Sequence, residues 1–378
     1  DEQPRSMADI LRVDQLGSLL RPTVLRDATI GAMRGRVPEA NLRAIQDEAV
    51  AGVLAAQAAH GIPILTDGEF RRRNFVDSVA TSVSGMERWR DAWAHRFLAE
   101  VEHREHPGFS APPPQVADAQ PATERLRFVR NAPLAEWQAA AALTALPVKS
   151  TVLSPHRVAL CIDPGASAGI YAGIGEVLAD AAAAIHEIVT GLRDAGCPYV
   201  QVDAPSYVAF LDADRRAGLV AQGIDPDRLL GAVIEAERAA VAGIDGVTLG
   251  IHVCRGNRPN AKWGTGPYDA IAEQLFAAIP HQRLLLEYDT ERAGGFEPLR
   301  FVPPGKVAVL GVISTKSPVV ETVDQVVWLR QAGCQIMQGF LYAKPMTVSQ
   351  LIQWMHKQEG NDHFDGGVWA ATEIKEFV

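Results

Sequence analysis

Residues 246–254 read Gly246-Val-Thr-Leu-Gly-Ile-His252-Val-Cys254, an apolar run that ends in an imidazole and a thiol. Side chains two positions apart on a strand lie on the same face, so His252 and Cys254 are expected to point the same way. Taken alone, such a pair is more often two buried core residues than two ligands of a metal ion. The function of the pair therefore depends on what the rest of the chain places beside it.

Runs of this kind recur along the chain and alternate with helical segments. Short β-rich runs bounded by turn residues occur at 14–19, 62–66, 148–153, 199–204, 246–252, 283–288, 307–313 and 335–341. Alanine-rich amphipathic segments lie between most of them, at 173–195, 226–243, 268–279 and 322–332. This alternation predicts a parallel α/β sheet, and eight strands predict a TIM (β/α)8 barrel that forms one domain over residues 1–378.

The exception to the alternation is the segment 70–147, which is too long for a single crossover helix. It contains Trp89, Trp93, Trp137 and a proline-rich stretch at 107–121. We interpret this segment as an insertion after the second strand that caps the mouth of the barrel. A disordered or merely stabilising excursion is the alternative.

Composition argues against several classes of protein. The 378 residues carry a net charge of -9 without a basic stripe, which argues against nucleic-acid binding. No apolar run approaches the ~18 residues of a membrane span, and nothing resembles a signal peptide. The four cysteines, at 161, 197, 254 and 334, are too widely spaced to suggest a disulfide framework. We expect a globular cytoplasmic protein; the sequence does not indicate an oligomeric state.

Polar residues follow the predicted strands at their carboxyl ends, where the active sites of TIM barrels lie. The candidates are Gly17, Ser18, Glu69, Asp203, His252, Cys254 and Glu287. His252, Cys254 and Glu287 follow two neighbouring strands and offer nitrogen, sulfur and oxygen donors, a set that suits Zn²⁺. The alternative for Glu287 is a salt bridge with Arg255 or Arg292 at the barrel mouth.

Several longer motifs carry a family resemblance. They are Leu16-Gly17-Ser18-Leu-Leu-Arg21-Pro22, Thr66-Asp67-Gly68-Glu69-Phe70-Arg71-Arg72, Gln201-Val-Asp203-Ala-Pro205, His252-Val-Cys254-Arg255-Gly256-Asn257, Leu286-Glu287-Tyr288-Asp289, Phe296-Glu297-Pro298-Leu299-Arg300 and Val309-Leu-Gly-Val-Ile-Ser-Thr-Lys316. In this order they resemble the C-terminal catalytic barrel of cobalamin-independent methionine synthase, most closely its short single-barrel relatives. The resemblance covers roughly residues 14–320.

The resemblance implies a zinc-dependent S-methyltransferase. In that family a zinc ion held by His, Cys, Glu and a second Cys binds the homocysteine thiol as a thiolate, which attacks the methyl group of a methyltetrahydrofolate. Carried over to this chain, His252, Cys254 and Glu287 would be metal ligands and catalytic residues. The implied cofactor is Zn²⁺, and the implied partners are a homocysteine-like thiol and a small methyl donor.

The resemblance also implies a pocket for an amino acid. Ser18, together with Gly17, would hold the carboxylate, while Glu69 and Asp203 would bind the ammonium group. Structural alternatives remain for three of these residues. Ser18 could occupy a turn, Glu69 could pair with the arginines at 71–73, and Asp203 could cap the next helix.

The chain departs from the family pattern near its end. The family's fourth ligand is a Cys at the end of strand eight, whereas Cys334 lies at the start of the expected strand 335–341. Residues 329–345 instead resemble the last strand of EAL-type phosphodiesterase barrels, although the acidic metal-binding motifs of those enzymes are absent. Either Cys334 still reaches zinc, or three protein ligands suffice, or the site is degraded. The alternative function is a binding or structural barrel of chimeric origin without a complete zinc site.

Overall fold

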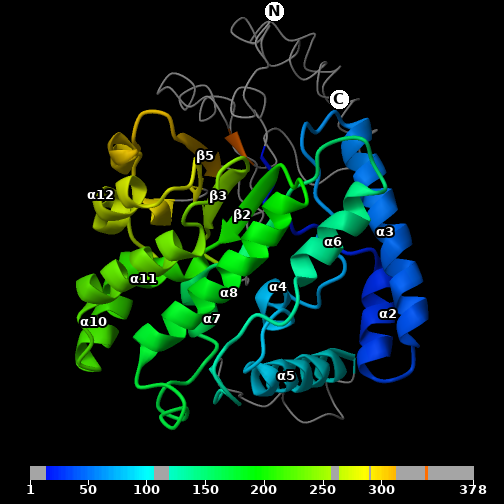
Figure 1. Ribbon diagram of the computed structural model, residues 1–378, viewed down its shortest axis with the longest axis horizontal. Helices are drawn as coiled ribbons and strands as arrows, with labels where there is room; N and C mark the ends of the chain where they lie inside the picture. Colours follow the sequence, from blue (N-terminus) through cyan, green and yellow to red (C-terminus); the bar gives the residue numbers. More distant parts are fainter. Residues whose placement is uncertain (1–13, 106–118, 257–263, 289–290, 312–336, 339–378) are drawn as a thin grey trace, which may run out of the picture.

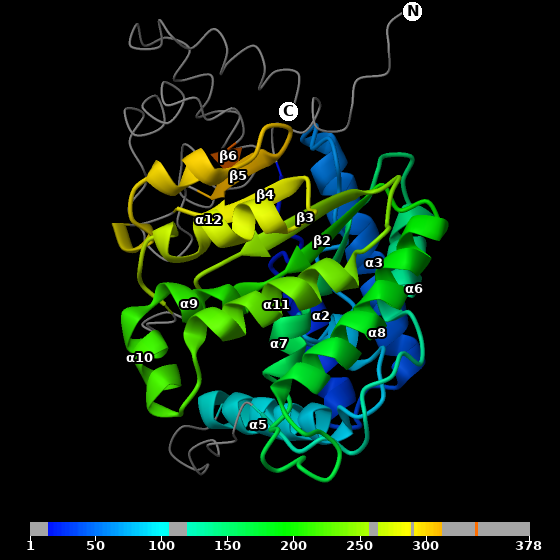
Figure 2. The ribbon, with the colours of Figure 1, turned by 60° about the vertical axis from the view of Figure 1, so that its left-hand side comes forward.

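Within the described residues, six parallel strands form a single sheet whose order in space equals their order in the sequence. The computed structural model describes residues 14–105, 119–256, 264–288, 291–311 and 337–338. The strands are β1 (Ser150–Leu153), β2 (Tyr199–Asp203), β3 (Thr248–Val253), β4 (Arg283–Glu287), β5 (Val307–Gly311) and β6 (Met337–Gln338). Helices lie along one side of this sheet (Figures 1 and 2). Sequential parallel order with helical crossovers is the arrangement of a TIM barrel, and the predicted fold class is confirmed.

The crossovers between the strands are amphipathic helices. α8 (Ile174–Asp194), α11 (Pro226–Ala240) and α12 (Asp269–Ala278) connect β1 to β2, β2 to β3 and β3 to β4. The buried face of α8 recurs every three or four residues, at Val177, Ala181, Ile185, Ile188 and Leu192. Asp225 begins α11 because its side chain accepts hydrogen bonds from the backbone N–H groups of Asp227 and Arg228. Crossovers of this kind place each strand beside the previous one.

Further helices follow the strand ends and the start of the described chain. Those that follow strand ends are α7 (Pro155–Ala159), η1 (Pro205–Tyr207), α9 (Val208–Leu211), α10 (Ala213–Ala221), η2 (Glu291–Ala293) and η3 (Glu297–Phe301). Near the start of the chain, α2 (Thr23–Met33) packs against α3 (Glu39–Ala59). No helix within the described ranges is both long and apolar enough to cross a membrane. The expected cytoplasmic location stays a prediction.

Two of the eight expected strands do not form as such. The run 62–66 makes one isolated parallel bridge, between Leu65 and Val148 at the edge of the sheet. Pro63 has no N–H to donate, which limits its pairing with a neighbouring strand. The run 14–19 has no strand assignment, and Gly17 interrupts it with a φ of +115°. It nevertheless lies beside the sheet, because Gln201 on β2 donates to the Leu16 carbonyl at 2.7 Å.

The described part of the segment 70–147 contains three helices joined by irregular stretches. It holds α4 (Asp77–Ala80), α5 (Glu87–Glu105) and α6 (Ala132–Ala141). α6 packs against β1 and α8, as a crossover helix does. α5 lies away from the sheet beyond α7 (Figures 1 and 2), and the Arg73 guanidinium sits 5.5 Å over the ring of Trp93 on this helix. The boundaries of the insertion and the single-domain assignment stay predictions.

Candidate functional site

Neighbouring strand ends place four of the predicted residues in one row. Asp203 at the end of β2 is in register with His252 on β3, and His252 is in register with Leu285 on β4. Continuing this register by two residues aligns Cys254 with Glu287. Because side chains two positions apart share a face, the row offers two carboxylates, an imidazole and a thiol at one edge of the sheet.

His252 is held by Asp203. Its Nδ1 atom lies 3.1 Å from Asp203 Oδ1, and both side chains are only 13% exposed. A carboxylate oxygen can only accept, so in this contact the imidazole carries a proton on Nδ1. In the neutral ring the lone pair then belongs to Nε2, which is the form that binds a metal ion or another electrophile.

Gln201 holds Asp203 in turn. Its Nε2 donates to Asp203 Oδ1 at 2.7 Å, while its Oε1 accepts from Lys149 Nζ at 2.8 Å. Gln201 is fully buried. Because the lysine ammonium can only donate, it determines that the carbonyl end of the amide faces Lys149 and the NH₂ end faces Asp203. A continuous hydrogen-bonded path therefore runs from Lys149 through Gln201 and Asp203 to His252.

A buried ionic cluster lies at the inner end of this path. Asp14 accepts from Lys149 Nζ at 2.7 Å, from Arg283 Nε at 2.9 Å and from the Tyr199 hydroxyl at 2.9 Å. Burial by itself would raise the pKa of Asp14, but Lys149 and Arg283 together hold that pKa below its ordinary value. The cluster connects the start of the described chain to β2 and β4, and its Lys149 also holds Gln201 in place through a hydrogen bond.

Glu287 uses both carboxylate oxygens within the protein. Oε2 accepts from the backbone N–H of Arg255 at 2.7 Å, and Oε1 forms an ion pair with Arg292. The side chain is 11% exposed. The barrel-mouth salt bridge considered from the sequence is therefore present in the structure. Cys254, which precedes Arg255, is half-buried.

Glu69 forms a second buried part of the site. It is 3% exposed, and its φ of +57° is unusual for a residue other than glycine. Its Oε1 accepts from the Thr151 hydroxyl at 2.6 Å and from Arg72 Nη1 at 3.2 Å. Burial raises the pKa of Glu69, Arg72 opposes that rise, and the negative charge of Asp203 adds to it, so the pKa lies above its ordinary value. Glu69 and Asp203 are thus electrostatically linked.

Arg72 braces Glu69 from the protein interior. Its Nε donates to Glu136 at 2.8 Å and its Nη2 donates to the Thr151 carbonyl at 2.8 Å. Gly17 packs against the other side of the same group, since a Cβ at Gly17 would lie 2.6 Å from Thr151 Cγ2 and 3.4 Å from Glu69 Oε1. The chain can approach Glu69 this closely only because residue 17 has no side chain.

The remaining predicted residues are less closely assembled. Ser18 is exposed. Cys334 and almost all of the EAL-like stretch lie outside the described residues. Within the part of the chain that the structure describes, no three His, Cys, Asp or Glu side chains converge closely enough to hold a metal ion. The donor types still fit Zn²⁺, because an imidazole oriented by a carboxylate stands beside a thiol and a second carboxylate. The ion pair with Arg292 keeps Glu287 out of such a set.

Two residues that hold this site, Gln201 and Thr151, received no role from the sequence. Gln201 could have been found, because it is a polar residue two positions before Asp203 and therefore on the same face of β2. Thr151 carries no such signal. Its contact with Glu69 joins segments far apart in the chain, which only the folded structure brings together. Arg72 lies three residues after Glu69 and forms the ion pair that the sequence offered as an alternative for Glu69.

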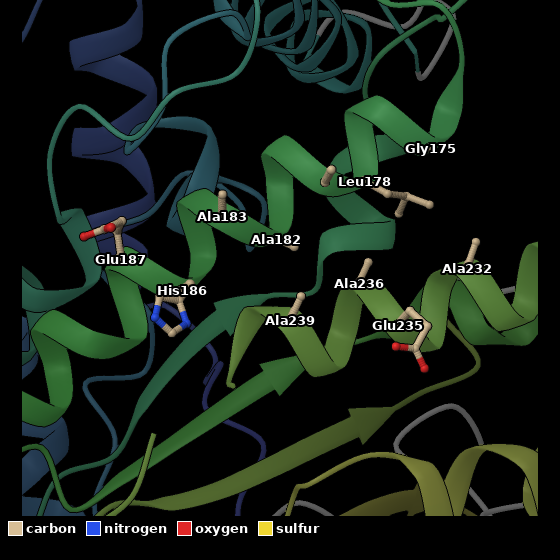
Figure 3. A pocket seen from close by; sticks show the side chains of 11 residues that line it. Gly175, Leu178, Ala182, Ala183, His186, Glu187, Ala232, Glu235, Ala236 and Ala239 are labelled. Carbon is tan, nitrogen blue, oxygen red and sulfur yellow. The ribbon is translucent and has the colours of Figure 1, made fainter. Parts of the chain in front are cut away.

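A groove with a volume of about 550 Å³ lies elsewhere, between α8 and α11. Figure 3 shows alanine side chains of both helices facing this groove, with His186, Glu187 and Glu235 at its sides. None of the predicted site residues lines it. The groove therefore belongs to the surface of the crossover helices and not to the strand ends.

Comparison with known proteins identifies several relatives. No protein-family model matches the chain. The uncharacterized protein YxjH of Bacillus subtilis is 31% identical over 319 residues, which cover 83% of this chain and 80% of that protein. The 5-methyltetrahydropteroyltriglutamate–homocysteine methyltransferase of Mycolicibacterium paratuberculosis is 25% identical over 288 residues, or 74% of this chain and 33% of that enzyme.

Among solved structures, the fold is similar to that of a B12-independent methionine synthase from Shewanella sp. W3-18-1 in complex with selenomethionine. The TM-score is 0.60 at 16% sequence identity, and the match covers 90% of this chain and 93% of the other. At this identity the likeness concerns the fold alone.

Proposed function

The chain belongs to the family of cobalamin-independent methionine synthase barrels, and from this premise we propose that it transfers a methyl group to the sulfur of homocysteine or a similar thiol. The proposed donor is a methyltetrahydrofolate-like molecule, and the proposed cofactor is Zn²⁺. The observation that carries the proposal is the row of Asp203, His252, Cys254 and Glu287 at the strand ends.

His252, Cys254 and Glu287 would hold the metal ion. Zn²⁺ supplies a positive charge that lowers the pKa of a thiol, so that the sulfur is a thiolate and a good nucleophile at neutral pH. Asp203 supports this role because it keeps the proton of His252 on Nδ1 and leaves Nε2 to act as a ligand. Glu287 would have to release Arg292 in order to join the set.

Glu69 and Asp203 would receive the ammonium group of the amino acid. Burial first, and the negative charge of Asp203 in addition, raise the pKa of Glu69, and a cation between the two carboxylates would offset both effects. Asp203 uses Oδ1 for His252 and Gln201, so its Oδ2 is the oxygen left to meet the ligand. We propose that Gly17 and Ser18 hold the carboxylate of the same molecule.

In the proposed reaction the thiolate attacks the methyl carbon of the donor. A carbon–sulfur bond forms as the carbon–nitrogen bond breaks, and the donor nitrogen keeps the electron pair and takes up a proton. The buried walls of the site would exclude water from the nucleophile. The residues of this chain thus act mainly by binding and orienting the two reactants.

The experiment combines metal analysis with an assay of methyl transfer. Wild-type protein purified without chelators is analysed for zinc and incubated with homocysteine and 5-methyltetrahydrofolate, and methionine is measured. We expect stoichiometric zinc and catalytic turnover, and we expect Cys254→Ser to lose both. Cys161→Ser is the matched control, because Cys161 is buried near α7 and is none of the proposed ligands.

The proposal fails if the wild-type protein holds no zinc and forms no methionine, or if Cys254→Ser changes neither property. One observation favours the alternative, a binding barrel with an incomplete metal site, namely the ion pair that engages Glu287. Turnover with stoichiometric zinc would exclude that alternative.

A further inference from the structure

Arg255 is a fully buried arginine, 0% exposed, that directly follows Cys254. Its Nη1 donates to the Gly266 carbonyl at 2.7 Å and lies 3.4 Å from the Arg292 carbonyl. Its guanidinium carbon sits 4.6 Å over the ring of Tyr268. Nε and Nη2 are also buried, and neither has a hydrogen-bond partner among the described residues. One edge of this guanidinium is therefore satisfied and the other is not.

The unsatisfied edge has the geometry of a carboxylate receptor. Nε–H and Nη2–H lie in the guanidinium plane and project in parallel from the same edge, and their spacing matches the two oxygens of a carboxylate. Buried N–H groups without acceptors lower the stability of a protein and are rare. Two of them on one edge therefore indicate an acceptor that is not part of the described chain. The enclosed position would strengthen such a contact, since little water competes for it.

The other buried arginines of the described chain are paired with carboxylates. Arg72 contacts Glu69 and Glu136, and Arg283 contacts Asp14. Arg255 has no ion pair within the described residues. A buried charge without a counter-charge is strongly unfavourable, so this arginine needs an anion that the described chain does not provide.

We infer that the Nε and Nη2 edge of Arg255 binds a carboxylate of a ligand at the methyl-transfer site. The identity of the ligand rests on the proposed function. Two sources share this chemistry, the α-carboxylate of the amino-acid thiol and a glutamyl carboxylate of the methyl donor. The backbone N–H of Arg255 contacts Glu287 and the preceding residue is Cys254, so the chain at Arg255 adjoins the proposed metal ligands, while its guanidinium lies over Tyr268.

Two pairs of probes separate these sources in calorimetric titrations of the wild-type protein. L-Methionine is compared with L-methioninamide, which lacks the carboxylate, and 5-methyltetrahydrofolate is compared with 5-methyltetrahydropteroate, which lacks the glutamate. We expect the carboxylate-free member of one pair to bind roughly 10- to 100-fold more weakly, because two charge-assisted hydrogen bonds are lost. Because Gly17 and Ser18 are also proposed to hold the α-carboxylate, the pair whose difference is lost in Arg255→Lys identifies the source.

Arg255→Lys tests the role of the Nε and Nη2 edge, because lysine keeps the positive charge but cannot form the two parallel hydrogen bonds. We expect it to remove the preference for the carboxylate and to leave the affinity for the carboxylate-free probe unchanged. Arg125→Lys is the matched control, because Arg125 also lies over a tyrosine ring, 5.2 Å from Tyr171, but its Nε and Nη2 edge is paired with Asp180. We expect no change in probe binding there.

Equal binding within both pairs of probes would overturn the inference, as would a preference that survives Arg255→Lys. If the lysine variant does not fold, equal binding within both pairs in the wild-type titrations still overturns the inference. Methyl transfer without any carboxylate preference would refute the role of Arg255 and leave the proposed function standing. The absence of both binding and transfer would refute both.

Discussion

Replacement of Asp203 by Asn separates two roles of this carboxylate. In the structure Oδ1 accepts from His252 Nδ1 at 3.1 Å and from Gln201 Nε2 at 2.7 Å. If Asp203 orients His252, its charge sets the tautomer of the imidazole and the basicity of Nε2. If it serves only the substrate ammonium group, the metal site does not depend on it. Asn has nearly the same size as Asp and keeps one acceptor oxygen, so the substitution removes mainly the charge.

The expected effect follows from the two hydrogen bonds. A hydrogen bond to a charged group contributes about 1.5–3 kcal/mol and a neutral one about 0.5–1.5 kcal/mol, so each bond loses roughly 1 kcal/mol. Two such losses amount to about 2 kcal/mol, or roughly 30-fold in an equilibrium constant. Carboxylates that orient a metal-binding histidine commonly affect metal affinity by about 10- to 100-fold, which agrees with this estimate. We therefore expect Asp203→Asn to weaken zinc binding by about 30-fold.

Competition with a chromophoric chelator at fixed pH measures the zinc affinity directly. Asp225→Asn is the matched control, because Asp225 caps α11 through two backbone N–H groups and Asn caps helices equally well. We expect that control to bind zinc like the wild-type protein. An Asp203→Asn variant with unchanged zinc affinity and a raised KM for the thiol would refute the orienting role and assign Asp203 to the substrate alone.

Three further predictions concern stability. Gly17→Ala should destabilise the protein by about 2–4 kcal/mol in urea unfolding, because the added Cβ would lie 2.6 Å from a neighbouring side chain. Gly35 is the control: its φ is +70° but no atom lies within 4 Å of the added Cβ, so Gly35→Ala should cost only about 1 kcal/mol. Burial raises the pKa of Glu237 to about 8, so at lower pH the native state holds a proton that the unfolded chain has released. The free energy of unfolding should therefore fall as the pH rises toward 8, by at most about 1.4 kcal/mol per pH unit. Glu237→Gln should lessen this fall in thermal unfolding, and a pH profile identical to that of the wild-type protein would contradict the prediction. Lys149→Met should cost about 3–5 kcal/mol in the same urea assay because it leaves the buried Asp14 with one cation fewer, and a loss below about 1 kcal/mol would contradict this.

The strands and crossover helices were predictable because their signals are local. Periodicity located every strand of the sheet and its main crossover helices, since each element buries a face that recurs at a regular spacing. The runs 14–19 and 62–66 were mistaken for regular strands, because periodicity alone does not show the φ of Gly17 or weigh Pro63 against the apolar residues around it. Leu65 still pairs beside β1 at Val148, and the run 14–19 contacts residues of β2 and β4.

The sequence by itself determined which chemical groups stand at the strand ends. The alternation of strands and helices is enough to send Asp203, His252, Cys254 and Glu287 to one edge of a parallel sheet, whatever their detailed contacts. Only the tertiary structure decided the partners of these groups: Asp203 on His252, Arg292 on Glu287, and a buried Arg255 with one edge unsatisfied. The physical reason is that burial patterns repeat over a few residues, whereas a hydrogen bond depends on side-chain positions within a few tenths of an ångström, set by packing between segments far apart in the chain.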